Sequence, residues 1–177
     1  MLKPELKQLI KEMTQEIYKI YELPELNATS NLEKVVQTLG GTVAYTYNKS
    51  TYQDSIVKTG ENSFCIILPH KQTNEQNALS IGQRLGDLFL HMKYRSNESV
   101  WNNIPLNKPF ESKDFTETNM SNYFAGYFLM PEDKFREIVQ KNTENNKCNT
   151  KYVAKYFGVS ISTASWWGYK LGLFEFL

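Results

Sequence analysis

Residues 79–92, with the sequence LSIGQRLGDLFLHM, combine the apolar spacing of a buried helix with three polar side chains. Gln83, Arg84 and Asp87 interrupt the apolar positions, and helical spacing places these three side chains close to one another. The apolar positions are Leu79, Ile81, Leu85, Leu88 and Leu90. Because a buried polar group is costly unless it is paired, the sequence predicts a helix over about residues 74–93 whose polar groups have specific partners.

Composition limits the kind of protein that carries this helix. The chain has 177 residues, 41% of them apolar, which is enough for the core of one domain of ordinary size. Its formal net charge of +1 argues against a protein that holds nucleic acid mainly through bulk charge. No apolar run reaches the length of a membrane span, and the N-terminal sequence predicts an amphipathic helix rather than a signal peptide. Cys65 and Cys148 lie far apart without metal-site spacing, so we expect a reduced, cytoplasmic protein.

The remaining patterns predict an α+β fold, with a small, mostly antiparallel sheet packed against helices. Helical patterns cover residues 3–21 and the stretch from Ser30, an expected N-cap, to Gly40. Three β-branched and aromatic runs between Thr42 and Leu68 predict an antiparallel meander. Residues 94–115 read as an irregular connection, and a second strong helix runs from about Glu117 to Pro131, which occupies the first turn of the next helix.

The order of elements and two motifs resemble the ImmA/IrrE family of zinc-peptidase-like proteins over roughly residues 30–175. GQRLGDLFLH (82–91) stands where the family has a helix with AHELGH, and MSNYFAGYFLMP (120–131) stands where it has EAN-x-FA…LLMP. The second motif matches at Asn122, Phe124, Ala125, Leu129, Met130 and Pro131. The resemblance implies a zincin-like domain over residues 26–145, preceded by an N-terminal helix (1–25) and followed by a helix–turn–helix-like element (146–177).

The same resemblance places the family's zinc site on side chains of the wrong kind. The two histidine ligands correspond to Gln83 and Asp87, the glutamate base to Arg84, and the third ligand to Met120. Zinc prefers imidazole, thiolate or carboxylate ligands, and an amide or thioether suits it poorly. Arg84 adds a permanent positive charge and cannot act as a general base. We therefore expect a degenerate HExxH motif with no zinc and no catalysis, in which Arg84 and Asp87 neutralise each other.

Two alternatives for this region remain open at the level of sequence. Asp87 and His91 lie four residues apart on one helix and, with Glu117, could form a different metal site. We favour the simpler interpretation, in which His91 is a helix-end histidine and Glu117 an acid in a first helical turn. Gln83, Arg84, Asp87, His91 and Met120 are then the candidate binding groove of a former peptidase cleft.

The C-terminal element offers a DNA-binding alternative. A helix, a turn at Gly158 and a second helix give the layout of a DNA-reading helix–turn–helix. The second helix, however, lacks the Arg, Asn and Gln side chains that read bases. Trp166 and Trp167 are better suited to packing or to a protein partner, and since adjacent helical residues point about 100° apart, one should be buried and the other available.

These features favour a pseudo-peptidase that regulates by binding a protein. Members of the family it resembles are frequently carried by phages and mobile elements, where they antagonise or cleave the element's repressor. We expect the partner to be such a helix–turn–helix repressor, with no membrane partner and no direct contact to nucleic acid. The alternatives are a metallopeptidase with unorthodox ligands and a DNA-binding regulator.

Overall fold

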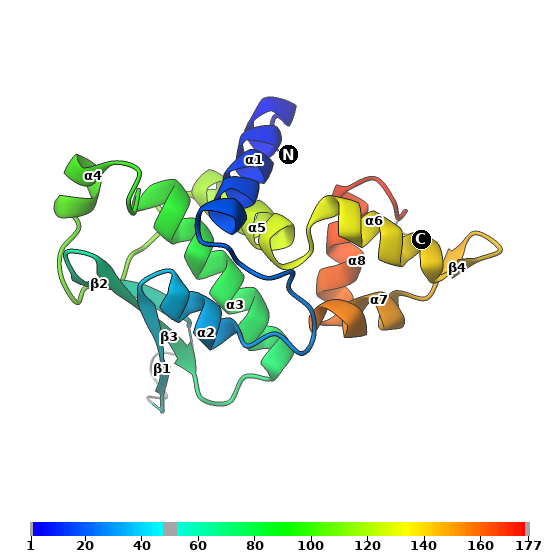
Figure 1. The fold of residues 1–177 in the computed structure, drawn as a ribbon, viewed down its shortest axis with the longest axis horizontal. Coiled ribbons are helices and arrows are strands. Elements are labelled where there is room, and N and C mark those ends of the chain that lie inside the picture. Colours follow the sequence, from blue (N-terminus) through cyan, green and yellow to red (C-terminus); the bar gives the residue numbers. More distant parts are fainter. Residues whose placement is uncertain (1, 48–52, 176–177) are drawn as a thin grey trace.

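The computed structural model describes residues 2–47 and 53–175 of the chain (Figure 1). Helices account for most of it, and strands form one three-stranded sheet and one short hairpin. The elements are α1 (Pro4–Ile20), α2 (Leu32–Thr38), β1 (Gly41–Thr46), β2 (Ser55–Gly60), β3 (Ser63–Pro69), α3 (Asn74–Gly86), the π-helix η1 (Asp87–His91), α4 (Glu98–Asn102), α5 (Phe115–Leu129), α6 (Glu132–Lys141), β4 (Thr143–Glu144), β5 (Lys147–Cys148), α7 (Thr150–Phe157) and α8 (Ile161–Lys170). The predicted α+β fold class, a small sheet on helices, is confirmed.

The three-stranded sheet has the order β1-β3-β2, so the predicted meander is wrong. β1 lies parallel to β3, with Gly41 opposite Phe64, whereas β2 is antiparallel to β3. β3 contains the most continuous apolar run of the three, and both Ile66 and Leu68 are completely buried. A strand of that kind is stable in the centre of a sheet, which explains why both other strands pair with it.

The outer edge of β2 is covered by the chain itself. The backbone N–H of Asn107 donates to the Lys58 carbonyl at 2.8 Å, and that of Phe110 donates to the Ile56 carbonyl at 2.9 Å. Lys58 is buried, and its ammonium group donates to the carbonyl of Trp101 in α4 at 2.9 Å. The connection predicted as irregular therefore has a structural role, because it pairs with an edge that would otherwise be open to another strand.

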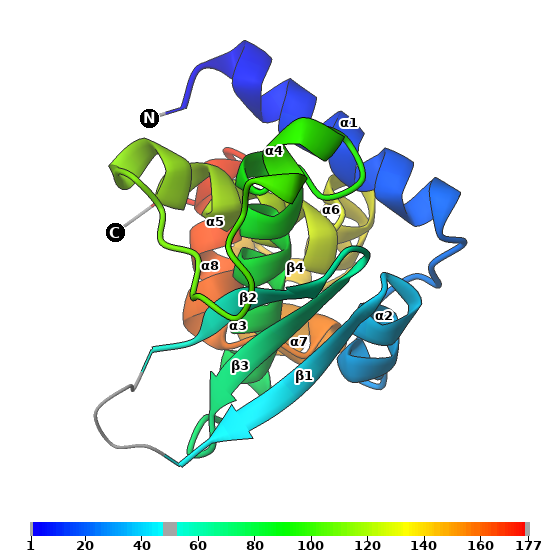
Figure 2. The same cartoon turned by 90° about the vertical axis from the view of Figure 1, so that its left-hand side faces the viewer.

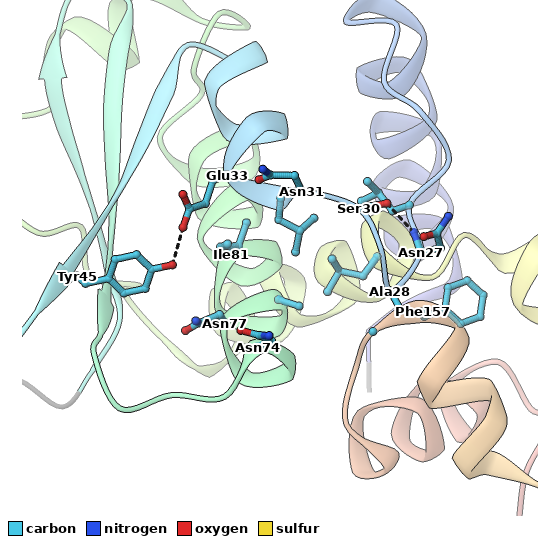
Figure 3. Close-up of a pocket in the computed structure, with 15 residues that line it drawn as sticks. Asn27, Ala28, Ser30, Asn31, Glu33, Tyr45, Asn74, Asn77, Ile81 and Phe157 are labelled. Carbon is cyan, nitrogen blue, oxygen red and sulfur yellow. Dashed lines mark hydrogen bonds between the residues drawn. The ribbon is translucent and has the colours of Figure 1, made fainter.

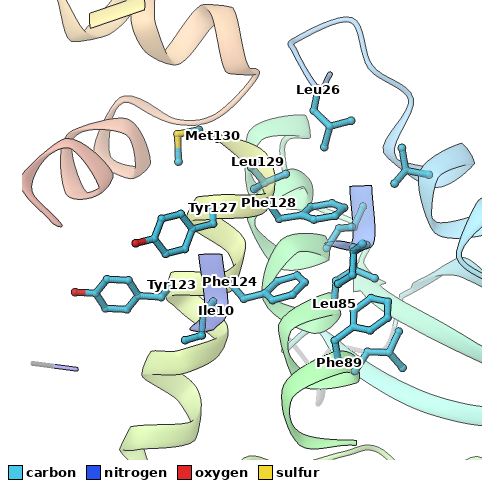
Figure 4. Close-up of a cluster of buried hydrophobic side chains, with 14 of the residues drawn as sticks. Ile10, Leu26, Leu85, Phe89, Tyr123, Phe124, Tyr127, Phe128, Leu129 and Met130 are labelled. Carbon is cyan, nitrogen blue, oxygen red and sulfur yellow. The ribbon is translucent and has the colours of Figure 1, made fainter. Parts of the chain in front are cut away.

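Two helices, α3 and α5, form the centre of the molecule. Figure 2 shows α3 passing behind the sheet, with α1 crossing above it. Phe124 and Phe128 of α5 point toward Leu85 and Phe89 (Figure 4). Gly86 makes the close approach possible, since a Cβ there would lie 2.8 Å from the Cα of Ser121. The packing brings residues 83–87 of one family-like motif against residues 120–122 of the other.

Three predicted helix boundaries need correction. The helix expected over 74–93 ends at Gly86 and continues as η1, in which the Met92 N–H donates to the Asp87 carbonyl at 2.9 Å. Asn31, rather than Ser30, caps α2 by accepting from the Lys34 N–H. Pro131 is the N-cap of α6 rather than a member of its first turn. The two cap positions differ from the expected ones by a single residue, which sequence patterns do not resolve.

The C-terminal helices lie on the side of α5 away from the sheet (Figure 1). Gly158 adopts a left-handed conformation at the end of α7, with φ of 67°, as the predicted turn requires. α8 packs against α5 through Trp167, whose ring lies over Gly126. Within the described ranges, no helix combines the length and hydrophobicity that a membrane crossing requires.

Candidate functional site

The positions that the resemblance assigns to zinc ligands and base lie where α3 and η1 pack against α5. Gln83 is partly exposed, and its Nε2 donates to Oδ1 of Asn122 at 2.7 Å. This bond joins the two family-like motifs directly. The bond satisfies part of the hydrogen-bonding capacity of the Gln83 amide. Because Gln83 lies on α3 and Asn122 on α5, it also contributes to the contact between the two helices.

Arg84 and Asp87 form the predicted ion pair, and the structure adds two partners that the sequence did not reveal. The Nη1 of Arg84 lies 3.0 Å from Oδ2 of Asp87, and its Nε lies 3.3 Å from Oδ2 of Asp54. Asp87 is completely buried, and its Oδ1 accepts a hydrogen bond from the Ser121 hydroxyl at 2.6 Å. Asp54 comes from the residue before β2, far away in sequence. In the sequence, Asp54 is recognisable only as an acidic residue before a predicted strand, which does not indicate a contact with Arg84.

The two ion pairs are charge contacts rather than well-aligned hydrogen bonds. Neither Nε of Arg84 nor the Oδ2 atoms of Asp54 and Asp87 meet hydrogen-bond geometry, although all three atoms are buried. Burial raises the pKa of Asp87 above its ordinary value, and the attraction of Arg84 and the hydrogen bond from Ser121 oppose this rise. The folded chain therefore holds a proton on Asp87 more readily than the unfolded chain does.

This pKa direction predicts how stability depends on pH. A carboxyl whose pKa is raised on folding contributes stability that is fully present below its unfolded pKa of about 4 and is lost as pH rises through the folded pKa. The free energy of unfolding of the wild type, relative to Asp87→Asn, should therefore fall between about pH 4 and neutrality. Urea unfolding of both proteins across this range measures the difference. An advantage of the wild type that grows with pH would mean that the Arg84 pair outweighs burial.

His91 and Met120 lie beside this network, and His91 acts on it only through an electrostatic attraction that lowers the pKa of Asp87. The His91 Nε2 is 3.1 Å from the backbone carbonyl of Glu117, and the imidazole stacks on the Phe110 ring at 6.3 Å between centroids. The Glu117 carboxylate accepts from the backbone N–H of Lys113 at 2.7 Å instead of facing His91. Met120 packs against the hydrophobic core. Asp87, His91 and Glu117 are thus not brought together as a set of ligands.

The donor set does not fit the zinc ion that the resemblance implies. The four positions supply an amide, a guanidinium, a carboxylate paired with that guanidinium, and a thioether, whereas a catalytic zinc needs three imidazole, thiolate or carboxylate ligands. Over residues 2–47 and 53–175, no three His, Cys, Asp or Glu side chains are grouped closely enough to hold a metal ion. The side chains at these positions are therefore not those of a catalytic zinc site.

A pocket of about 240 Å³ adjoins Gln83, between α3, α5 and α8. It is lined by Leu79, Gln83, Asn122, Ser162, Thr163 and Trp166. Trp167 is completely buried and its Nε1 donates to the Met130 carbonyl at 2.9 Å, whereas Trp166 is partly exposed at the pocket wall. One tryptophan is thus buried and the other partly exposed, as their adjacent positions on a helix predict, and we call this pocket the α3–α8 groove.

Two lysines border the aromatic side of the α3–α8 groove. The ammonium group of Lys170 lies 5.9 Å from the Trp166 ring and 6.0 Å from the Tyr123 ring, and that of Lys7 lies 5.2 Å from Tyr123. The Tyr123 ring is buried and Trp166 is partly exposed, so the cation–π contact that a partner can reach is that of Lys170 with Trp166. A partner that reaches Trp166 would therefore meet positive charge.

Comparisons with known proteins agree with this geometry. No curated protein shows significant similarity to the chain. A solved Mycobacterium tuberculosis transcriptional regulator has a similar fold, with a TM-score of 0.57 and 15% sequence identity over 89% of this chain and 45% of the regulator. The chain thus spans less than half of that protein, and the likeness shows the fold alone. The family model Peptidase_M78, described as the IrrE N-terminal-like domain, matches residues 47–165, which include both motifs and the polar network. The chain belongs to the Peptidase_M78 family of IrrE N-terminal-like domains.

Proposed function

We propose that this protein is a non-catalytic pseudo-peptidase of the cytoplasm that regulates by binding a helix–turn–helix repressor. In this account, residues 26–145 form the degenerate peptidase domain, and residues 1–25 and 146–177 add helices around it. The observation that carries the proposal is the self-paired network at the former ligand positions, where Arg84 contacts Asp87 and Asp54. A peptidase needs a base that can take a proton from water, and arginine keeps its proton at any working pH.

The α3–α8 groove is the place where we expect the partner to bind. Aromatic side chains that are half-exposed beside a pocket are typical anchors of protein interfaces, and Trp166 is placed in this way. The edge of β2 is not available for an added strand, because residues 106–110 pair with it. Lys170, which lies over the Trp166 ring at the groove, favours a partner with an acidic segment.

Binding without cleavage is sufficient for regulation. A repressor held by this chain is removed from the free pool, and operator occupancy then falls by mass action. The fold likeness to a transcriptional regulator supports a regulatory context without identifying the partner. The alternative of a DNA-binding regulator is less favoured, because α8 carries no Arg, Asn or Gln side chain to read bases. The alternative of a metallopeptidase is less favoured, because the residues that the structure describes include no group of zinc ligands.

Titrating the chain into a repressor–operator complex tests the proposal. The probe is a helix–turn–helix repressor bound to its operator, with operator DNA followed by gel shift and repressor mass by mass spectrometry. We expect the DNA to be released while the repressor stays intact. Trp166→Ala should weaken release at least tenfold, as for an interface hot spot of about 1.4 kcal/mol or more.

Tyr152→Ala is the matched control, because Tyr152 is an exposed aromatic side chain on α7 that does not line the groove. It should release DNA as the wild type does. A shortened repressor would show that the chain is a peptidase, and a shift of operator DNA by the chain alone would show that it binds DNA. An operator still occupied at a tenfold excess of the chain would also contradict the proposal.

A further inference from the structure

A second cavity, of about 410 Å³, lies on the other face of α3 (Figure 3). Asn77 and Ile81 line it, one helical turn apart, whereas Leu79 and Gln83 line the α3–α8 groove. Two residues correspond to a rotation of about 200°, so α3 separates the two sites. Leu26 to Tyr45 supply more than half of the lining, and all of them precede the range that the family model matches. We call this cavity the α2–α7 pocket.

The α2–α7 pocket has an apolar floor, and a main-chain hydrogen bond holds the segment that closes one of its sides. Ile81, Leu129 and Phe157 form this floor from three different helices. The segment between α1 and α2 closes one side, held by the Ala28 N–H, which donates to the Tyr156 carbonyl at 2.8 Å. A floor of this kind suits the flat or apolar body of a small molecule.

The polar wall of the pocket offers mainly side-chain amides. The carbonyl oxygens of Asn27 and Asn31 accept from the backbone N–H groups of Thr29 and Lys34, at 2.9 and 3.1 Å. Those two amides thus have their N–H groups left to offer, since each amide nitrogen carries two donors. The wall therefore presents hydrogen-bond donors above an apolar floor.

Asn77 supplies the group that most needs a partner. Its Oδ1 is buried and has no hydrogen-bond partner, although the side chain lines the pocket. An unsatisfied carbonyl oxygen is costly to bury. Oδ1 is enclosed as the side chain stands, so a ligand meets the amide oxygen and nitrogen together only when the Asn77 side chain rotates toward the pocket. Such an edge is complementary to another amide or to the amino and ring nitrogens of adenine, which asparagine binds with two hydrogen bonds.

Charge narrows the ligand class further. The fifteen lining residues include no lysine, arginine or histidine, and Glu33 is the single charged one. The Tyr45 hydroxyl donates to Glu33 at 2.6 Å, and this hydrogen bond raises the pKa of Tyr45 to about 12. A phosphate or carboxylate in the pocket would meet a negative charge with no cation to offset it. The ligand should therefore be uncharged.

We propose that the α2–α7 pocket binds an uncharged heteroaromatic molecule with an amide-like donor–acceptor edge, of the purine nucleoside or nicotinamide type. The ring lies on the apolar floor, and the edge bonds the carboxamide of Asn77. The pocket volume falls within the usual range for small-molecule sites. The proposal does not depend on the partner of the α3–α8 groove.

Isothermal titration of the full chain with adenosine, nicotinamide and adenosine monophosphate tests the proposal. Saturable binding of adenosine or nicotinamide is expected. The probe with the higher affinity shows whether the ligand is of the purine nucleoside or of the nicotinamide type. The monophosphate should bind at least tenfold more weakly than adenosine. Asn77→Leu should weaken binding about tenfold or more, as expected for the loss of a bidentate pair, while Asn102→Leu on the exposed side of α4 should not change it.

Glu33→Gln keeps the proposal testable if Asn77→Leu fails to fold. Glu33 is exposed, so its replacement should not disturb the fold, and it is the charged residue that lines the pocket. Without its negative charge the monophosphate is repelled less, so the ratio of adenosine affinity to monophosphate affinity should decrease. The proposal would be overturned if neither uncharged probe gave saturable binding, or if Asn77→Leu folded and bound as the wild type does. A ratio unchanged in Glu33→Gln would also overturn it, because the preference would then not come from this pocket.

Discussion

Replacing Trp167 by alanine should lower the free energy of unfolding by about 3–5 kcal/mol, the usual cost of truncating a large buried aromatic residue. Trp167 is completely buried and lies over Gly126 of α5, where no other residue leaves room for the ring. Truncation also leaves the Met130 carbonyl without the indole N–H that donates to it at 2.9 Å. Urea unfolding measures the loss, which should accompany detachment of α8 from α5.

Trp166→Ala is the matched control for this prediction. Trp166 is the neighbouring residue on α8, of the same type, but it is partly exposed at the α3–α8 groove. Its truncation should cost about 1 kcal/mol or less, in the range of changes outside the core. Equal losses in the two variants would show that α8 does not pack with Trp167 inward, and the argument for an available Trp166 would fail.

Asp87→Ala should also destabilise the chain, by about 2–3 kcal/mol. Asp87 is completely enclosed, and the buried Ser121 hydroxyl donates to it at 2.6 Å. Removing the acceptor leaves that hydroxyl unsatisfied, at a cost of about 1–3 kcal/mol, and the missing carboxyl leaves a small cavity as well. Arg84 keeps Asp54 as a partner, so the variant does not strand an isolated cation.

Asp87→Asn separates the contacts of Asp87 from its charge. The amide keeps the volume and the acceptor for Ser121, and burial already favours the uncharged form of Asp87. We therefore expect this variant to unfold within about 1 kcal/mol of the wild type at neutral pH. If Asp87→Asn cost as much as Asp87→Ala, the charge of Asp87 in its pair with Arg84 would contribute more to stability than its hydrogen bond with Ser121 and its packing.

The helices could be predicted from the sequence because their signals are local. The apolar period of residues 3–21 and the run before Pro131 correspond to α1 and α5. Strand order is not a local property, and the parallel pair of β1 and β3 depends on a crossover that the pattern of each strand does not contain. The change from α3 to η1 has no sequence signal either, although π-helical turns often occur at functional sites.

The contact between Arg84 and Asp87 could be predicted from the sequence, whereas their partners Asp54 and Ser121 could not. The spacing of Arg84 and Asp87 reveals their contact, since residues three apart on a helix are neighbours. Asp54 and Ser121 come from other elements, 30 or more residues away, and no periodicity connects them with Arg84 or Asp87. The α2–α7 pocket has no motif at all, because its walls meet only after the segment before α2 folds against α7.

Zinc content tests the central claim most directly. The chain should be purified without any chelator, and its zinc measured by elemental analysis against protein concentration. We predict well below one zinc per chain, because the expected ligand positions hold Gln83 and Met120, which suit zinc poorly, and Asp87, which is paired with Arg84. Stoichiometric zinc that is lost on replacing Asp87 or His91 would contradict this account and show that the site is an active metal centre.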